Sequence, residues 1–221
     1  MKKRPFARNL LGVLAWAPLA MPVLAQSQKD APLPATNPGP SQAELTEVAT
    51  PDENHQLLAS LSGTWAFVGR HTLPGPAKRT FEFRGTVVRT ALLNGRYFRT
   101  ETTGAPLKMA WSAGELVPYS DVTLEGYDKV KKKFVTASFS NELDTGIITT
   151  EGTYDPATRT ITYAGETVSH IHRDMPLGTK FTFQDTVRIT DHDHFVFTRH
   201  EFVAGQEVIT TELTYTRTKN Q

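Results

Sequence analysis

The stretch His55-Gln-Leu-Leu-Ala-Ser-Leu-Ser-Gly-Thr-Trp65-Ala-Phe67 decides the fold of this chain. Its leucines lie on one face of a short helix. The Ser-Gly pair that follows predicts the end of that helix, because glycine adopts the bend that a helix-to-strand junction needs. Trp65 begins the next element and offers a large apolar area on which a core can condense. The stretch therefore predicts a short helix that leads straight into a strand anchored by Trp65.

The rest of the chain, to about residue 219, has the pattern of an all-β protein. We expect about ten strands separated by turns that carry Gly, Pro, Asn or Asp. No crossover helix is available, so neighbouring strands should be antiparallel. An up-and-down meander of this length favours a closed barrel, which leaves no free edge and is wide enough for a small ligand. The expected strands are 64–71, 79–92, 96–103, 121–127, 133–141, 147–154, 159–169, 180–190, 194–203 and 207–217.

Apolar residues alternate along the expected strands, which separates an inward from an outward face. Trp65 and Phe67 share the inward face of the first strand, and Arg217 falls on the inward face of the last. These two strands are neighbours in a closed barrel, so Arg217 is predicted to lie over the Trp65 ring and close one end. Such a cation–π pair contributes roughly 0.5–2 kcal/mol. In the eighth strand the inward apolar residues are Phe181, Phe183, Val187 and Ile189.

Several segments resemble a known family. They span nearly the whole expected domain and lie at 55–65, 93–98, 126–135, 145–155, 191–197 and 215–217. These segments are similar to those of the DUF1579 proteins, uncharacterised exported bacterial proteins, and the Gly-Thr-Trp65 motif with its distant Arg resembles the calycin group that includes the lipocalins. The resemblance implies a lipocalin-like barrel and no established chemistry.

The first 25 residues have the composition of a secretory signal peptide. Four basic residues among the first eight precede a mostly apolar stretch at 10–19, which is shorter than a membrane span needs. The Val-Leu-Ala sequence at 23–25 offers a cleavage site. We expect cleavage after Ala25, no membrane span after cleavage, and a periplasmic or secreted bacterial protein. The alternative is an uncleaved anchor.

Residues 26–50 have the composition of a linker. The segment contains four prolines and no aromatic residue, so it cannot bury enough apolar surface to offset its ordering entropy, and we expect it to be disordered. One folded domain is then expected over 51–219. The formal charge of +1 falls to −3 without the leader, which gives no reason to expect a nucleic-acid partner. The chain has no cysteine, so the core must be stable without disulfides.

His170 and His172 are the candidate metal ligands. In a strand their rings project from one face about 7 Å apart, which suits two ligands of one transition ion. A second cluster at 191–194 should lie roughly 30 Å away, at the opposite end of the barrel. Two histidines are an incomplete ligand set, so solvated loop histidines are the alternative, and the sequence identifies no cofactor.

Residues 104–120 are predicted as a long irregular loop that is rich in apolar side chains. So many apolar residues outside a strand should cover either a bound ligand or the mouth of the barrel. The candidate ligand contacts are Leu107, Met109, Trp111 and Tyr97.

The sequence contains no nucleophile or phosphate-binding motif, neither Gly-x-Ser-x-Gly nor a phosphate loop nor His-Glu-x-x-His. Nothing in it therefore predicts an enzyme. We expect an exported lipocalin-like protein that binds a small, largely apolar ligand in its barrel. The alternatives are a metal-dependent enzyme that uses His170 and His172, and a structural or interaction module of the cell envelope.

Overall fold

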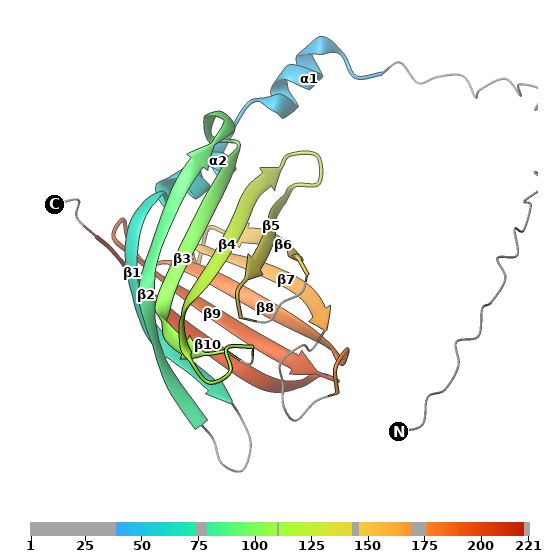
Figure 1. Ribbon diagram of the computed structural model, residues 1–221. Helices are drawn as coiled ribbons and strands as arrows, with labels where there is room; N and C mark the ends of the chain where they lie inside the picture. The colour runs from blue at the N-terminus through green and yellow to red at the C-terminus, as the bar shows by residue number, and fades with distance from the viewer. Residues whose placement is uncertain (1–38, 74–78, 110, 143–145, 169–175, 219–221) are drawn as a thin grey trace, which may run out of the picture. The chain divides into compact units, whose positions relative to one another are not determined.

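The computed structural model describes residues 39–73, 79–109, 111–142, 146–168 and 176–218. Two helices and a short 3-10 turn, η1, accompany ten strands (Figure 1). The helices and the turn are α1 (Gln42–Ala49), α2 (Glu53–Ser60) and η1 (Leu93–Gly95). The strands are β1 (Gly63–Leu73), β2 (Arg79–Leu92), β3 (Tyr97–Lys108), β4 (Leu116–Asp128), β5 (Lys133–Ser140), β6 (Ile148–Asp155), β7 (Thr160–Val168), β8 (Lys180–Ile189), β9 (His194–Val203) and β10 (Gln206–Arg217).

The strands form one closed antiparallel barrel, which confirms the predicted fold class. Each strand pairs with its neighbours in sequence, and β1 closes the ring by pairing with β10. Trp65 lies opposite Arg217 in that last pairing, and Phe67 lies opposite Tyr215. This register sets which side chains face the interior in all the remaining strands, because strand residues alternate between the two faces.

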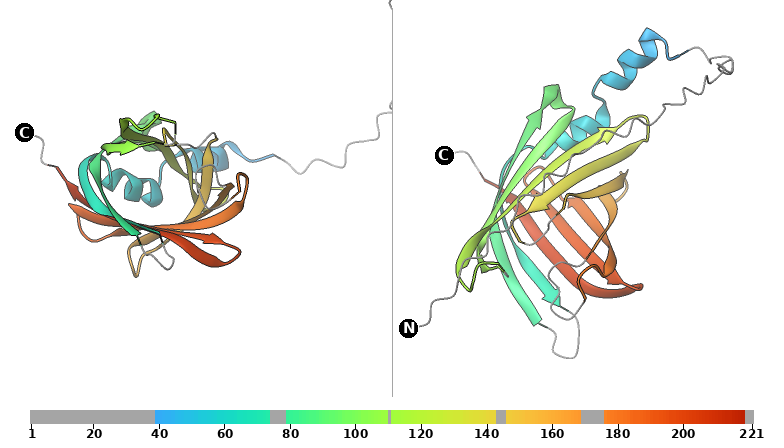
Figure 2. Two further views of the ribbon diagram at one scale, coloured as in Figure 1. Left: turned by 60° about the horizontal axis from the view of Figure 1, so that its bottom comes forward. Right: turned by 45° about the vertical axis from the view of Figure 1, so that its right-hand side comes forward.

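The helix α2 closes one end of the barrel, and the left view of Figure 2 shows it inside the ring of strands. Asp52 caps the helix, since its carboxylate accepts the backbone N–H groups of Asn54 and His55. Leu58 on the buried face is fully buried. It packs into one of two apolar clusters beneath the helix, the one that consists of Leu58, Phe98, Phe134, Ile161 and Tyr163. Trp65 and Phe67 belong to the other cluster.

Gly63 makes the bend between α2 and β1, as the sequence predicted. Its φ of 124° lies where side chains are strained, and a Cβ atom there would stand 2.7 Å from the Arg217 guanidinium. Glycine is therefore needed for both the backbone conformation and the close approach of Arg217.

Two expectations about irregular segments differ from the structure. The loop predicted at 104–120 is mostly strand, because a bulge between Gly104 and Pro106 lets β3 continue and Leu107 pair with Val117. Only the tip at 109–115 joins β3 to β4. Within the segment predicted as a disordered linker, residues 42–49 form α1, which the Ser41–Glu44 capping box begins. None of the described helices has the length and apolar character needed to cross a bilayer.

Candidate functional site in the barrel interior

The inward faces of the strands form two contrasting walls. Strands β1, β2 and β8 to β10 contribute mostly aromatic and aliphatic side chains. Strands β3 to β6 contribute mostly hydroxyl groups, which belong to Thr100, Thr102, Thr123, Thr136, Ser138, Ser140 and Thr150. Because the barrel is closed, an apolar wall faces a hydroxyl wall across the interior.

Five rings of the apolar wall and the ring of Tyr119 on β4 form a continuous chain, which we call the aromatic arc. In order they are Tyr119, Phe83, Phe67, Tyr215, Phe195 and Trp65. Successive ring centroids lie 5.2, 5.3, 5.4, 4.2 and 4.7 Å apart. These are contact distances for aromatic pairs, so each ring fixes the next. The arc runs from the closed end, at Trp65, to Tyr119 on β4.

The interior beside the hydroxyl wall is open to water. Thr102, Thr123 and Ser138 point inward, yet each remains half-buried rather than buried. In a closed barrel an inward side chain is exposed only where solvent reaches it from within. Short hydroxyl side chains therefore leave space opposite the aromatic arc.

Two ion pairs lie within this interior. Together with the side chain of Tyr163, they form a group that we call the polar belt. In the first pair Arg89 of β2 contacts Glu125 of β4, and the Tyr163 hydroxyl of β7 donates a hydrogen bond to the same carboxylate. Both charged side chains are nearly buried, and Arg89 Cζ lies 5.2 Å from the Phe98 ring centroid. Burial, followed by the Glu125 charge, raises the pKa of Tyr163 well above its usual value. The phenol therefore stays protonated as a donor.

The second ion pair joins Arg199 of β9 to Asp185 of β8. The Arg199 Nε and Nη2 atoms each donate to one Asp185 oxygen at 2.7 Å, which is a bidentate pair. Arg199 also stacks on Phe183, with Cζ 4.5 Å from the ring centroid. Burial alone would lower the pKa of Arg199, but the Asp185 carboxylate outweighs it and raises the pKa. Since Tyr163 lies opposite Asp185 in the register, the two ion pairs form one belt across the barrel.

Two further phenols, Tyr119 and Tyr215, face the interior without hydrogen bonds. Among the described residues neither hydroxyl has a hydrogen-bond partner. Burial, followed by the charge of Asp121, raises the pKa of both groups. Both are consequently protonated donors at neutral pH, and neither has an acceptor within the described part of the chain.

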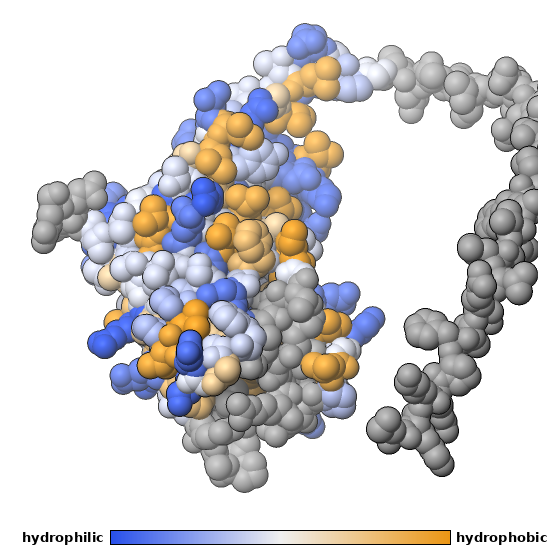
Figure 3. Space-filling view, viewed as in Figure 1, coloured by the Kyte–Doolittle hydropathy of each residue, from blue (hydrophilic) through white to orange (hydrophobic). Residues whose placement is uncertain are grey.

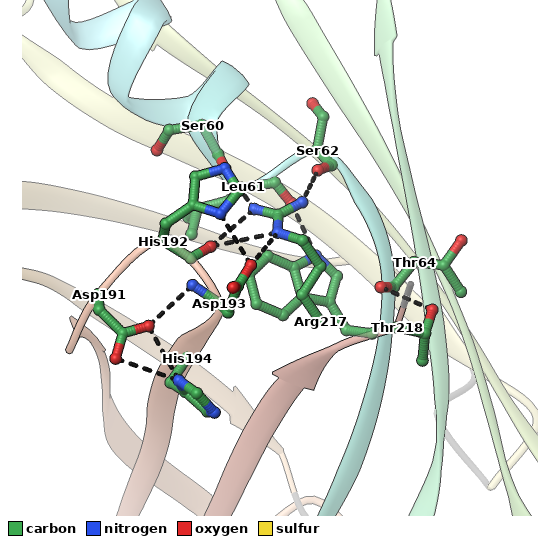
Figure 4. A network of polar contacts seen from close by, with 11 residues as sticks. Ser60, Leu61, Ser62, Thr64, Asp191, His192, Asp193, His194, Arg217 and Thr218 are labelled. Atoms are coloured by element: carbon green, nitrogen blue, oxygen red, sulfur yellow. Dashed lines mark hydrogen bonds and ion pairs between the residues drawn. The ribbon is translucent and has the colours of Figure 1, made fainter. Parts of the chain in front are cut away.

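The closed end is held by Arg217, which Figure 4 shows among its partners. Its guanidinium donates to the backbone carbonyls of Ser60, Ser62 and His192 at 2.8, 2.6 and 3.1 Å. Its Cζ lies 4.1 Å from the Trp65 ring centroid. Arg217 thus links the end of α2 and the β8–β9 turn to β10. The role of this side chain is therefore structural.

The residues predicted to contact a ligand lie in different surroundings. Met109 is buried and Leu107 is half-buried at the far end of the barrel. Trp111 is 53% exposed, and its indole N–H donates to the carbonyls of Asn141 and Glu142 at 2.8 and 3.1 Å. Tyr97 points outward from β3 and is 47% exposed, so it does not face the interior.

The predicted metal ligands His170 and His172 lie outside the described residues. Those that are described include no group of three His, Asp or Glu side chains that could hold a metal ion. The second histidine cluster forms an exposed turn. There Asp191 accepts the Asp193 backbone N–H and contacts the His194 ring at 2.9 Å.

A furrow of about 890 Å³ is lined by residues of β5 to β9. Outward side chains such as Val135, Ala164 and Phe202 contribute to it. Thr136, Thr150 and Phe183 of the inward faces line it as well. Figure 3 shows apolar side chains scattered among polar ones on one face of the molecule. Scattered exposure of this kind is ordinary for a folded protein.

The sequence analysis missed the polar belt. Asp185 sits among the inward apolar residues of β8, and this interruption of the alternation was the available signal. Arg89 likewise lies two residues after the inward-facing Val87, so it is on the same face of β2. A charged residue on an inward face predicts a partner across the barrel.

Comparisons with known proteins agree with this architecture. A family model described as "Protein of unknown function (DUF1579)" matches residues 50–217. The crystal structure of Rv2717c from M. tuberculosis has a TM-score of 0.50 at 19% identity and covers 77% of this chain and 100% of its own. The structure of the S-type phycobiliprotein lyase CPES from Guillardia theta has a TM-score of 0.49 at 13% identity, and the match covers 82% of this chain and 100% of the lyase chain. No curated protein gave a match. At 19% identity, the likeness to Rv2717c shows a similar fold and nothing beyond it.

Proposed function

The chain belongs to the DUF1579 family, and from the geometry of its barrel we propose that it is an exported carrier that binds one small, largely apolar molecule in the interior. The observation that carries the proposal is the aromatic arc, which faces an open hydroxyl wall inside a closed barrel. Pockets for small molecules commonly combine apolar walls with a few placed polar groups. The buried polar belt supplies such groups beside the arc.

The ligand that fits these walls is amphipathic. One of its faces would lie against the rings of the arc, and polar groups on the other would meet threonine and serine hydroxyls. Export is part of the proposal because the basic and apolar leader has the composition of a signal peptide.

A matched pair of substitutions tests binding in the interior. Ser138→Trp would fill the space beside the hydroxyl wall, whereas Ala137→Trp places the same side chain on the outer face of the same strand. Nile red, an uncharged dye that fluoresces in apolar surroundings, serves as the probe. We expect saturable binding to the wild type, at least a tenfold weaker affinity in Ser138→Trp, and an unchanged affinity in Ala137→Trp.

Circular dichroism controls for folding of both variants. If the dye binds both variants and the wild type with one affinity, it binds outside the barrel and the proposed function is wrong.

A further inference from the structure

The two unpaired phenols of the arc identify a class of ligand. We propose that Tyr119 and Tyr215 donate hydrogen bonds to an uncharged acceptor oxygen, such as a ketone or amide carbonyl, of a ring-containing ligand that lies on the aromatic arc. This inference rests on the proposed interior binding and adds the chemistry of recognition.

The positions of both hydroxyls are fixed by ring packing. Tyr119 meets Phe83 edge to face at 5.2 Å, and Tyr215 stacks on Phe195 at 4.2 Å with an interplanar angle of 10°. Tyr215 is buried and Tyr119 is half-buried. A buried tyrosine ring normally has a partner for its hydroxyl. Here neither hydroxyl has one among the described residues, although both rings are immobilised. Two placed donors without acceptors match a ligand that brings the acceptor.

The two phenols also share one neighbourhood. Tyr119 comes from β4 and Tyr215 from β10, with Phe83 and Phe67 between them along the arc. A ligand on those two rings therefore lies between the two phenol side chains.

Charge favours a neutral acceptor over an ionised one. Arg199 is the cation that acts on Tyr119, and its Nε and Nη2 atoms both bind Asp185, which offsets its charge. Asp121 places a negative charge near both phenols. That negative charge disfavours an anionic ligand beside the two phenols. An ammonium group has no lone pair with which to accept a phenol hydrogen bond.

Two probes of matched shape isolate the acceptor. Benzophenone has two rings joined by a carbonyl, and diphenylmethane has the same rings joined by a methylene. Equilibrium dialysis against the full-length protein gives both affinities. We expect benzophenone to bind roughly tenfold more tightly than diphenylmethane, since each of two hydrogen bonds contributes a few-fold. Diphenylacetate, an anion with the same rings, should bind more weakly than benzophenone.

Phenylalanine substitutions assign the effect to the hydroxyls. Tyr119→Phe and Tyr215→Phe should each weaken benzophenone binding roughly threefold and leave diphenylmethane unchanged, and the double variant should bind both probes equally. Tyr97→Phe, on the outer face, is the matched control. Three outcomes would overturn the acceptor site and leave interior binding intact. They are equal affinities of the wild type for the two neutral probes, unchanged benzophenone binding in the double variant, and tighter binding of diphenylacetate than of benzophenone. If the wild type binds neither neutral probe nor Nile red, interior binding itself is wrong.

Discussion

At the scale of single residues, Arg217 joins three backbone carbonyls and the Trp65 ring at the closed end. Replacement by methionine keeps an unbranched apolar stem but leaves the carbonyls of Ser60, Ser62 and His192 without this donor. It also removes the cation over Trp65. We expect Arg217→Met to lower the free energy of unfolding by about 2–4 kcal/mol, measured by urea denaturation.

Arg99 provides the control for this measurement. It pairs with Glu101 on the outer face, where both side chains are about half exposed. Exposed pairs contribute roughly 0–1 kcal/mol, so Arg99→Met should change stability little. Equal losses in the two variants would show that Arg217 acts only as a surface charge.

The Arg89–Glu125 pair gives a second prediction at this scale. Glu125→Leu leaves a nearly buried guanidinium without its counter-ion and the Tyr163 hydroxyl without its acceptor. We expect a loss of about 3–5 kcal/mol in the free energy of unfolding. Adding Arg89→Met should recover most of that loss, because the uncompensated charge is removed. A double variant as unstable as Glu125→Leu would contradict this assignment of the cost.

At the scale of elements, α2 acts as the plug of the barrel through one side chain above all. Leu58 is fully buried and packs in the cluster that contains Phe98 and Phe134. Leu58→Ala should cost about 2–5 kcal/mol, because the rigid strands beneath cannot close the cavity. Leu45 on α1 is 49% exposed, so Leu45→Ala should stay within about 0.5 kcal/mol of the wild type. Chemical denaturation compares them, and equal losses would mean that α2 does not plug the core.

The hairpin of β3 and β4 shows why element boundaries were harder to predict than element types. Pro106 and Pro118 belong to the segment that was predicted as a loop, yet they lie opposite each other in the paired ladder. A bulge next to Pro106 absorbs the irregularity, so pairing resumes at Leu107. Local residue preferences do not contain this information, because the bulge depends on the partner strand.

At the scale of the molecule, the sequence predicted the barrel because strand alternation is repeated ten times and each repeat supports the others. The Trp65–Arg217 stack followed from strand alternation together with closure of the barrel. The polar belt did not follow, because it needs the register of strands that are far apart. Glu125 and Tyr163 are separated by 38 residues and meet only through the curvature of the barrel. The polar contacts of the interior therefore depend on the closed barrel and not on any one strand.

The response of the barrel to alkaline pH depends on its interior tyrosines. The pKa of Tyr119, Tyr163 and Tyr215 is raised in the folded state, chiefly by burial. Below the unfolded pKa of about 10 both states are protonated and no stability is lost. Above it, the unfolded chain releases protons that the folded protein keeps. The free energy of unfolding should therefore fall as pH rises from about 10 towards the folded pKa values, by about 1.4 kcal/mol per pH unit for each tyrosine.

Tyr215→Phe isolates one of these contributions. Its ring keeps the stacking on Phe195, and its hydroxyl has no hydrogen bond to lose among the described residues, so stability at neutral pH should hardly change. Above pH 10 the slope of unfolding free energy against pH should be shallower than in the wild type by about 1.4 kcal/mol per pH unit. Urea denaturation in steps of pH measures it, with exposed Tyr97→Phe as the control. An identical slope in Tyr215→Phe and the wild type would show that this phenol titrates normally and lies in water, and it would then be no fixed donor for a ligand.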